Sequence, residues 1–523
     1  MTRALRLFSI CCLILLSAIA ANAQLQLDNL QLPPLFPGLV IPIPQQPFAN
    51  PPKFIGSPAV ANPFPGAPVP QSPFMAPNGV SSVHLNAYQT DTYTTPGPLG
   101  HHPEVNSTFL AALCGTVTFD AKGRILVVCV GFRPTLYLLD PVTLERLAVM
   151  QLPQGSSNGT FGAGGYFYTD QLNRAIIPTQ TDDIYRIKIV DNKRGPSLVL
   201  DHTCSSSLPQ LVPSNESILS VFPDSSGLLW FTLSGDKGDP TNKPGQIGTL
   251  QPDPSDSNKC AIQLFKLPAG ELIQKSFAVD PDPSRGGVFI VSDHQLYRFD
   301  PSPSGLPTVT WHEPYERGSG VKLGQLVDGS GTTPTLMGTD LVAIDDNAPS
   351  QIDVVVFQRT ASSVAQRQIC KIPVFQPGAS AGFNSLIATD KSISIENNFG
   401  YDFQATLFGR TTSPGITRID VDDDRQGCHV VWTNNQLSVP NVVSQASLAT
   451  GLEYTYIKEP SSTLVDAWYF AAVDMHTGAT VYKILAGTGA LYDSHYSSVY
   501  IGPDGKTAYV GVLGGLVRIH DTY

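Results

Sequence analysis

The sequence is poor in charged residues and in the motifs that mark metal and redox centres. Only 14% of its 523 residues are charged, and it contains eight cysteines and four tryptophans. No C-x-x-C pair occurs, which excludes the usual zinc and thioredoxin-like motifs, and the C-x-x-C-H haem attachment motif is missing. The H-E-x-x-H motif of zinc proteases does not occur either. We therefore expect no haem and no zinc chemistry.

Long apolar runs and basic clusters are missing beyond the first 23 residues. No later segment reaches about 18 consecutive apolar residues, the length that a membrane-spanning helix needs. The chain has 32 basic against 43 acidic residues, a net charge of −11, without a basic stripe. This acidic balance argues against nucleic acid and anionic membranes as partners. We expect no stable membrane insertion.

The first 23 residues have the pattern of a secretory signal peptide. Arg3 and Arg6 precede an apolar run over residues 7–20, and Ala21-Asn22-Ala23 follows as a small-x-small cleavage site. A retained signal anchor is the alternative. We predict a secreted, extracellular protein that begins at Gln24.

Cysteine usage agrees with an oxidising compartment. Six cysteines remain after cleavage, at positions Cys114, Cys129, Cys204, Cys260, Cys370 and Cys428. Six cysteines allow 15 connectivities, of which sequential pairing (114–129, 204–260, 370–428) is the simplest. Asn106, Asn158 and Asn215 begin N-glycosylation sequons, which are acceptors only in a eukaryotic host.

Proline dominates residues 24–80, most densely from Leu32 to Pro77. Proline lacks the N–H and fixes φ, so this segment is expected to form neither a helix nor a central strand. We interpret it as an extended linker or arm, with a ligand for a proline-recognising partner as the alternative.

Residues 81–523 predict an all-β propeller. Short apolar runs alternate with Gly, Pro, Asp and Asn clusters, and no amphipathic helix exceeds two turns. A unit of about 45–55 residues recurs: an apolar strand, an Asp-x-x-Gly turn, a very apolar strand, a strand ending in Asp and a weaker outer strand. Such four-stranded units bury their faces by stacking radially.

The units start near residues 115, 164, 217, 275, 334, 384, 444 and 497. This spacing predicts eight blades, with seven as the alternative. The last unit has three clear strands before the chain ends, so its outer strand must come from elsewhere. We predict that Val83 to Thr90 supplies that strand and thereby pairs the two ends of the domain.

These repeats resemble the propeller superfamilies of quinoprotein dehydrogenases and of the senescence marker protein, gluconolactonase and strictosidine synthase group. The stretch from Ser392 to Asp521 is also similar to a family of secreted propellers without an assigned activity. Its recurring phrases lie at residues 395–401, 447–451 and 508–516. The likeness covers most of residues 81–523, but a propeller fold does not fix function.

Quinoprotein chemistry has little support in the residues. The tryptophan-docking repeat Ala-x-Asp-x-x-Thr-Gly-Lys-x-x-Trp is matched only in its front half, by Ala472 to Gly478, and Tyr482 stands where Trp would be. The chain also holds too few tryptophans to repeat the motif. We therefore expect no pyrroloquinoline quinone.

Acidic and amide residues follow the second strand of several units, where they are expected to face the axis. The gluconolactonase-like propellers hold a metal with Glu, Asn and Asp, which implies a calcium site here at Glu396, Asn397, Asp346 and Asn347. The alternative is that these residues cap strands and fill turns. Four further residues are candidates for the axial face: Asp293, Ser330, Thr333 and His495.

Two functions remain open at this point. The first is an extracellular binding or interaction module, a monomer whose partner is an unknown ligand or protein, because no complete catalytic constellation is visible. The second is a calcium-dependent lactonase or esterase with its site on the propeller axis.

Overall fold

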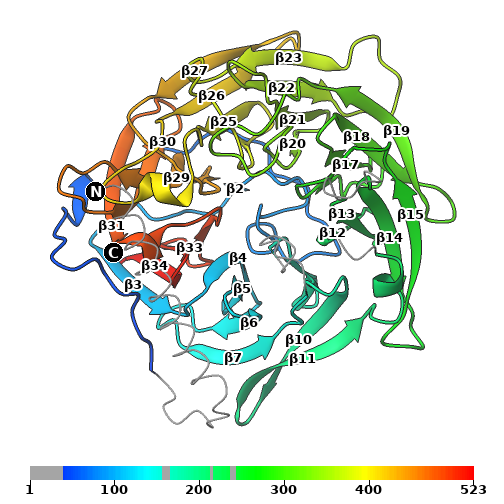
Figure 1. Cartoon of the computed structure of the whole chain (residues 1–523), viewed down its shortest axis with the longest axis horizontal. Helices are drawn as coiled ribbons and strands as arrows, with labels where there is room; N and C mark the ends of the chain where they lie inside the picture. Colours follow the sequence, from blue (N-terminus) through cyan, green and yellow to red (C-terminus); the bar gives the residue numbers. More distant parts are fainter. Residues whose placement is uncertain (1–38, 156–164, 213–215, 236–242) are drawn as a thin grey trace, which may run out of the picture.

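The chain forms an eight-bladed β-propeller (Figure 1). The structure is a computed structural model that describes residues 39–155, 165–212, 216–235 and 243–523. Helical structure in these residues is limited to three short 3₁₀ turns, at Leu208–Gln210, Phe403–Thr406 and Ala490–Tyr492. The predicted all-β class and the count of eight blades are confirmed.

Each blade is an antiparallel sheet whose first strand lies nearest the axis. Blade 1 contains β4 (Leu113–Phe119), β5 (Ile125–Val130), β6 (Pro134–Leu139) and β7 (Arg146–Gln151), and blade 2 contains β8 (Tyr168–Thr169), β9 (Arg174–Pro178), β10 (Ile184–Asn192) and β11 (Gly195–Thr203). Blade 3 contains β12 (Ile218–Pro223), β13 (Leu229–Leu233), β14 (Gln246–Pro252) and β15 (Cys260–Lys266). Blade 4 contains β16 (Ala278–Val279), β17 (Val288–Val291), β18 (Gln295–Pro301) and β19 (Pro307–Pro314).

Blades 5 to 8 follow the same order around the ring. Blade 5 contains β20 (Thr335–Met337), β21 (Leu341–Asp345), β22 (Asp353–Gln358) and β23 (Gln368–Pro373), and blade 6 contains β24 (Ile387–Ala388), β25 (Ser392–Glu396), β26 (Ile416–Val421) and β27 (Cys428–Asn434). Blade 7 contains β28 (Gln445–Ser447), β29 (Leu452–Glu459), β30 (Ala467–Asp474) and β31 (Thr480–Thr488). Blade 8 contains β32 (Val499–Ile501), β33 (Thr507–Val512) and β34 (Gly515–Asp521), with β3 (Pro103–Phe109) as its outer strand.

The recurring Asp-x-x-Gly turn has a clear physical role. In blade 1, the Asp120 carboxylate accepts hydrogen bonds from the backbone N–H groups of Lys122 and Arg124, both at 2.9 Å. Gly123 occupies the left-handed region at φ 73°, where a side chain would be strained. The turn therefore joins the first and second strands tightly, and its repetition is what made the blades visible in the sequence.

Large apolar side chains fill the space between neighbouring blades. Phe222 of blade 3 shows how: its ring lies 5.5 Å from the ring of Tyr168 in blade 2 and 5.5 Å from that of Phe277 before blade 4. All three side chains are buried. Each blade thus buries both faces by stacking, as the repeat pattern requires.

The closing strand differs from the prediction. β3 pairs antiparallel with β34 over the full length of both strands, from Pro103 opposite Asp521 to Phe109 opposite Gly515. The two ends of the propeller do pair, as predicted, but residues 83–90 are not the strand that does it. Instead they belong to a fully buried segment at the inner ends of the blades.

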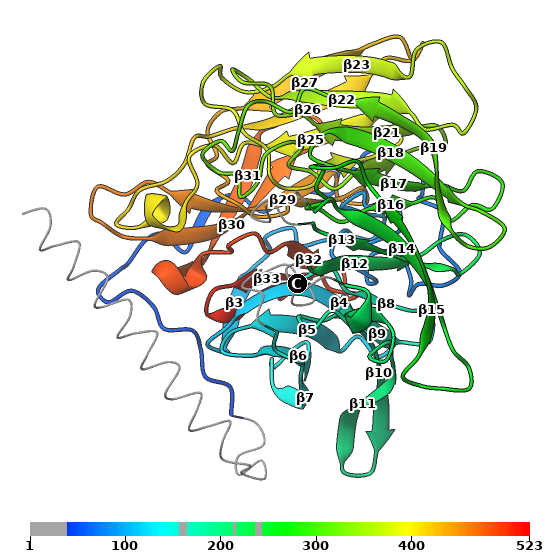
Figure 2. The same cartoon turned by 45° about the vertical axis from the view of Figure 1, so that its right-hand side comes forward.

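This segment, residues 80–93, is here called the plug. Its backbone carbonyls accept hydrogen bonds from residues in or directly after the first strands of six blades. The blue ribbon of this part of the chain lies inside the ring of blades (Figures 1 and 2). The donors are Phe119, Thr169, Val279, Leu336, Ala388, Ala446 and Leu448, which belong to blades 1, 2, 4, 5, 6 and 7. Its last residues form β2 (Thr92–Tyr93), parallel to β28. The plug therefore runs around the ring on the side where the first strands end.

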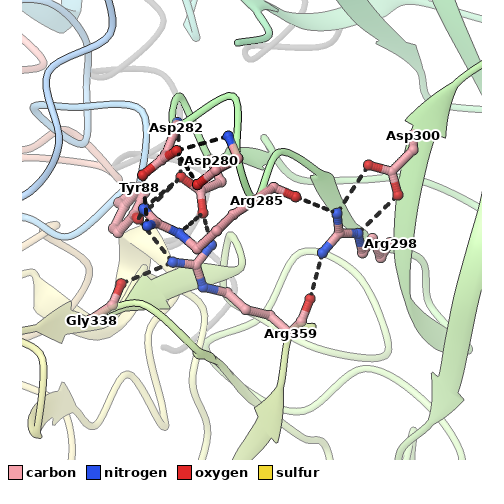
Figure 3. Close-up of polar contacts among 9 residues, drawn as sticks. Tyr88, Asp280, Asp282, Arg285, Arg298, Asp300, Gly338 and Arg359 are labelled. Atoms are coloured by element: carbon pink, nitrogen blue, oxygen red, sulfur yellow. Dashed lines mark hydrogen bonds and ion pairs between the residues drawn. The ribbon is translucent and has the colours of Figure 1, made fainter. Parts of the chain in front are cut away.

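A buried polar network holds the plug between blades 4 and 5 (Figure 3). The Tyr88 hydroxyl accepts hydrogen bonds from Arg359 at 2.8 Å and Arg285 at 3.0 Å, and it donates to Asp280 at 3.2 Å. Both arginines also form ion pairs with Asp280. Because Asp280 and Arg359 are almost fully buried, each charge depends on the others for compensation.

The residues before the plug lie along the propeller. β1 (Phe54–Gly56) pairs with β31 on the outer edge of blade 7, so that sheet has six strands. The backbone N–H of Asn62 donates to Thr450, and that of Phe64 donates to Leu448. Residues 39–80 thus follow the ring from its outer edge toward the plug.

The three predicted disulfides are confirmed with sequential pairing. Cys114–Cys129 joins the first two strands of blade 1. Cys204–Cys260 and Cys370–Cys428 each join the outer edges of neighbouring blades, 2 to 3 and 5 to 6. Three disulfides are consistent with an extracellular protein. Among the described residues, no helix is long and apolar enough to cross a membrane.

Candidate functional site

A cavity lies on the propeller axis, with the plug as its floor. It is lined by the connections between blades, which bring together residues from most of the chain. Its polar lining consists of His84, Thr116, Tyr166, Lys275, Thr333, Asn384, Ser385, His495, Tyr496, Ser497, Ser498 and Tyr500. The space measures about 60 Å³, which is room for about four water molecules. A small molecule or one end of a larger one would fit.

Lys275 is the cation of this cavity. Its Nζ donates a hydrogen bond to the Phe383 backbone carbonyl at 3.1 Å and lies 3.0 Å from the centre of the Phe383 ring. Within the described part of the chain, no carboxylate lies within ion-pairing distance of it. Burial lowers the pKa of Lys275 to about 7, against a smaller opposing effect of the Asp345 charge. A ligand carrying negative charge would supply the missing partner.

Asp345 organises the loop that enters blade 5. Its Oδ1 accepts hydrogen bonds from the Ser330 hydroxyl at 2.9 Å and from the Gly331 N–H at 2.7 Å. Burial raises the pKa of Asp345 to about 6, partly offset by these bonds. Gly331 is required here, since a Cβ at this position would lie 2.1 Å from the Gly382 carbonyl oxygen. Two inter-blade loops thus approach closely beside the cavity.

His84 connects the plug to two blades. Its Nδ1 lies 2.9 Å from Oδ2 of Asp91, and its Nε2 lies 3.1 Å from the Ser385 hydroxyl and 3.4 Å from the Thr333 hydroxyl. All four side chains are buried. The imidazole is therefore fixed at both nitrogens, with one side toward a carboxylate and the other toward the cavity.

A second polar group reaches the cavity through His495. Nδ1 of His495 lies 2.9 Å from the Tyr401 hydroxyl, and that hydroxyl also contacts both oxygens of Asp493 at 3.3 Å. Burial raises the pKa of Asp493 to about 6 and lowers the pKa of His495. Tyr496 packs edge-on against Phe383, with ring centres 4.9 Å apart, so this group adjoins the residue that holds Lys275.

The four residues predicted as calcium ligands have other partners. Nδ2 of Asn397 donates to the Ala379 carbonyl at 2.9 Å, and Nδ2 of Asn347 donates to the Gly320 carbonyl at 3.0 Å. Asp346 forms an ion pair with Lys371 at 2.8 Å. These bonds link Asn397, Asn347 and Asp346 to their own blades or the connections leading into them, and none of the four predicted ligands lines the axial cavity. Calcium at these residues stays a prediction.

Glu396 belongs instead to a buried acidic pair between blades 6 and 7. Burial and the neighbouring charge of Glu453 raise the pKa of Glu396 well above its usual range. The pKa of Glu453 is raised to about 7 by burial, although Ser394 donates a hydrogen bond to it at 2.7 Å.

In the residues that the structure describes, the one cluster of three His, Cys, Asp or Glu side chains at metal-binding spacing is His202, Cys204 and Cys260. Its two cysteines form a disulfide.

The other predicted axial residues divide into two groups. Thr333 and His495 line the cavity, and Ser330 lies behind it against Asp345. Asp293 instead accepts a hydrogen bond from the Leu272 N–H at 2.7 Å and contacts His294.

Of the sequon residues, Asn106 is exposed in β3, whereas Asn158 and Asn215 lie outside the described residues.

Sequence reasoning missed two main groups of the cavity. His84 was assigned to an outer strand, and Lys275 is a single lysine at the start of a repeat, without any pattern around it. Ser385 was visible only as one of many polar residues in the connections between blades. Neither His84 nor Lys275 therefore carried a local signal that could have placed it in the cavity.

The comparisons with known proteins find no sequence relative and only low structural similarity. The sequence matches no protein-family model and none of the curated proteins. The Dos1 propeller is similar over 86% of this chain and 94% of its own, at 10% identity and a TM-score of 0.40. Sqt1 of Chaetomium thermophilum, solved with the N-terminus of ribosomal protein L10, is similar over 82% of this chain and 98% of its own, at 11% identity and a TM-score of 0.41. At this level of similarity the function has to be argued from the cavity itself.

Proposed function

We propose that the protein is a secreted, monomeric binding module that takes a small carboxylate-bearing ligand in its axial cavity. The observation that carries this proposal is Lys275, a buried cation on the cavity wall without a carboxylate partner among the described residues. Burying a charge without a partner is unfavourable in free energy, because the charge loses its hydration. A ligand carboxylate would offset this cost by restoring the charged form of the lysine.

The remaining lining supports the same ligand class. Asn384, Ser497 and Thr333 offer hydrogen-bonding groups, while Phe383 and Tyr496 provide aromatic surface. Binding sites for small ligands combine such apolar walls with a few fixed polar groups. The signal peptide and the three disulfides support secretion, and the closed ring, with its last outer strand supplied by β3, supports a monomer.

The test uses acetate and acetamide, which have nearly the same shape but different charge. We expect acetate to raise the melting temperature of the protein at pH 6.5 and acetamide to have little effect, because only acetate pairs with Lys275. Lys275→Met should abolish the acetate effect, whereas Lys506→Met, at an exposed turn of blade 8, should preserve it. Equal shifts with both compounds, or an undiminished shift in Lys275→Met, would overturn the proposal.

A further inference from the structure

The axial cavity also contains a chain of three side chains with the connectivity of a nucleophile, a base and an orienting acid. The Ser385 hydroxyl lies 3.1 Å from Nε2 of His84, and Nδ1 of the same imidazole lies 2.9 Å from Oδ2 of Asp91. Ser385 and His84 both line the cavity. Such a chain is recognised by its geometry and not by the order of its members in the sequence.

The carboxylate fixes the tautomer of the imidazole. Because a carboxylate accepts hydrogen bonds, the proton of His84 resides on Nδ1, and Nε2 is left to accept from the Ser385 hydroxyl. The Gln445 side-chain amide donates to Asp91 Oδ1 at 3.4 Å and to the Val83 carbonyl at 3.1 Å. One side chain of blade 7 therefore positions both the acid and the residue before the base.

The backbone of the plug is strained where it presents these groups. Leu85, directly after His84, has φ 72°, and Asp91 itself has φ 53°. Non-glycine residues adopt this region only at an energetic cost, and such conformations cluster at functional sites.

We propose that Ser385, His84 and Asp91 act as nucleophile, general base and orienting carboxylate in the hydrolysis of a small carboxylic ester held in the axial cavity. This inference rests on the proposed ligand site, because the acid released by hydrolysis is the carboxylate expected beside Lys275. It differs from a calcium-dependent hydrolase in that every group belongs to the chain.

The reaction balances with these groups and one water. Ser385 Oγ attacks the ester carbonyl carbon while its proton moves to Nε2 of His84, and the C–O bond to the alcohol breaks as His84 returns that proton to the leaving oxygen. Water, deprotonated by His84, then attacks the acyl-serine ester, and the proton passes to Ser385 as the acid is released. Lys275, bonded to the carbonyl of Phe383 two residues before Ser385, supplies positive charge for the oxyanion.

The first test needs no variant. Diisopropyl fluorophosphate reacts with serines that a neighbouring base activates. We expect the folded wild-type protein to gain one covalent adduct, which peptide mapping locates at Ser385. Label on several exposed serines with none on Ser385, or no label at all, would overturn the proposal and leave His84 as a residue that only anchors the plug.

The second test follows the hydrolysis of phenyl acetate. We expect Ser385→Ala and His84→Asn to lower kcat/KM by about a hundredfold or more, whereas Ser304→Ala, at an exposed turn of blade 4, leaves it unchanged. Equal rates for wild type and Ser385→Ala would contradict the role of Ser385. Acetate should still stabilise Ser385→Ala, so loss of hydrolysis with retained binding separates this inference from the proposed function.

Discussion

At the scale of single residues, the protein keeps several ionisable side chains in places where their charged forms are unfavourable. Glu396 and Glu453 share a buried site between blades 6 and 7, and Lys275 lies buried on the cavity wall. Burial is the main cause of each pKa shift, which raises the values of the acids and lowers that of the lysine. The stability of the protein must therefore depend on pH.

Glu453 gives this dependence a testable sign. Its pKa is about 7 in the folded protein against 4.5 ordinarily, so between these values the folded state holds more protons than the unfolded state. Its contribution to the free energy of unfolding therefore falls as pH rises, by up to about 1.4 kcal/mol per pH unit. Glu453→Gln keeps an acceptor for Ser394 but cannot ionise, so it should flatten the profile and be more stable than wild type at pH 8.

Urea unfolding between pH 5 and pH 8 measures this effect. Glu104→Gln, at an exposed position of β3, serves as the control and should keep the wild-type slope. A Glu453→Gln profile as steep as that of the wild type would show that the carboxyl group is already ionised in the folded state.

At the scale of elements, the plug is the segment on which the proposed hydrolytic site depends. It supplies His84 and Asp91, and it is held by backbone bonds to six blades and by the network around Tyr88 (Figure 3). Because the network joins the plug to blades 4 and 5 through buried charges, its bonds should matter more than surface ion pairs do.

Removing the Tyr88 hydroxyl tests this link. Tyr88→Phe takes away the acceptor that Arg285 and Arg359 share, so we expect a loss of about 1–3 kcal/mol in the free energy of unfolding. Tyr185→Phe, at a half-buried position in β10, should change it by less than about 0.5 kcal/mol. If chemical unfolding gives the same midpoint for both variants, the network does not anchor the plug.

The plug also shows where sequence reasoning fails. Asp-x-x-Gly turns and apolar strands predict eight blades because these signals are local and repeat. Val83 to Thr90 alternates apolar and polar residues as an outer strand would, yet its polar side chains are buried and hydrogen-bonded: His84 to Asp91, and Asn86 to Thr90 at 2.7 Å. Alternation alone cannot distinguish a solvated face from a buried polar one.

The true closing strand gave a weaker signal, since β3 is half-exposed and carries few apolar residues. The candidate site was harder still to predict. Ser385 and His84 are 301 residues apart and meet only when the ring closes around the plug. The calcium ligands are predicted from residue type; in the fold Asp346, Asn347 and Asn397 contact their own blades or the connections leading into them, and calcium at these residues stays a prediction.

At the scale of the whole molecule, the ring is closed by β3 and fastened at its rim by two disulfides between neighbouring blades. Cys370 and Cys428 are separated by 58 residues, a loop whose closure stabilises a protein by up to about 4 kcal/mol in the chain-entropy model. We expect the double variant Cys370→Ala and Cys428→Ala to lose a large part of this free energy of unfolding. A loss below about 0.5 kcal/mol in chemical unfolding would mean that the ring holds blades 5 and 6 together without the bridge.

We propose that the axial cavity is the functional site of the molecule and that Lys275 provides its charge. The most direct measurement is the affinity for acetate between pH 7 and pH 9, a range above the titration of Asp345. Because the pKa of Lys275 is about 7, we predict that the affinity falls with rising pH, approaching tenfold per pH unit, and that Lys275→Met shows weak binding without this slope. An affinity that is constant over this range, or that falls equally in Lys275→Met, would contradict the account.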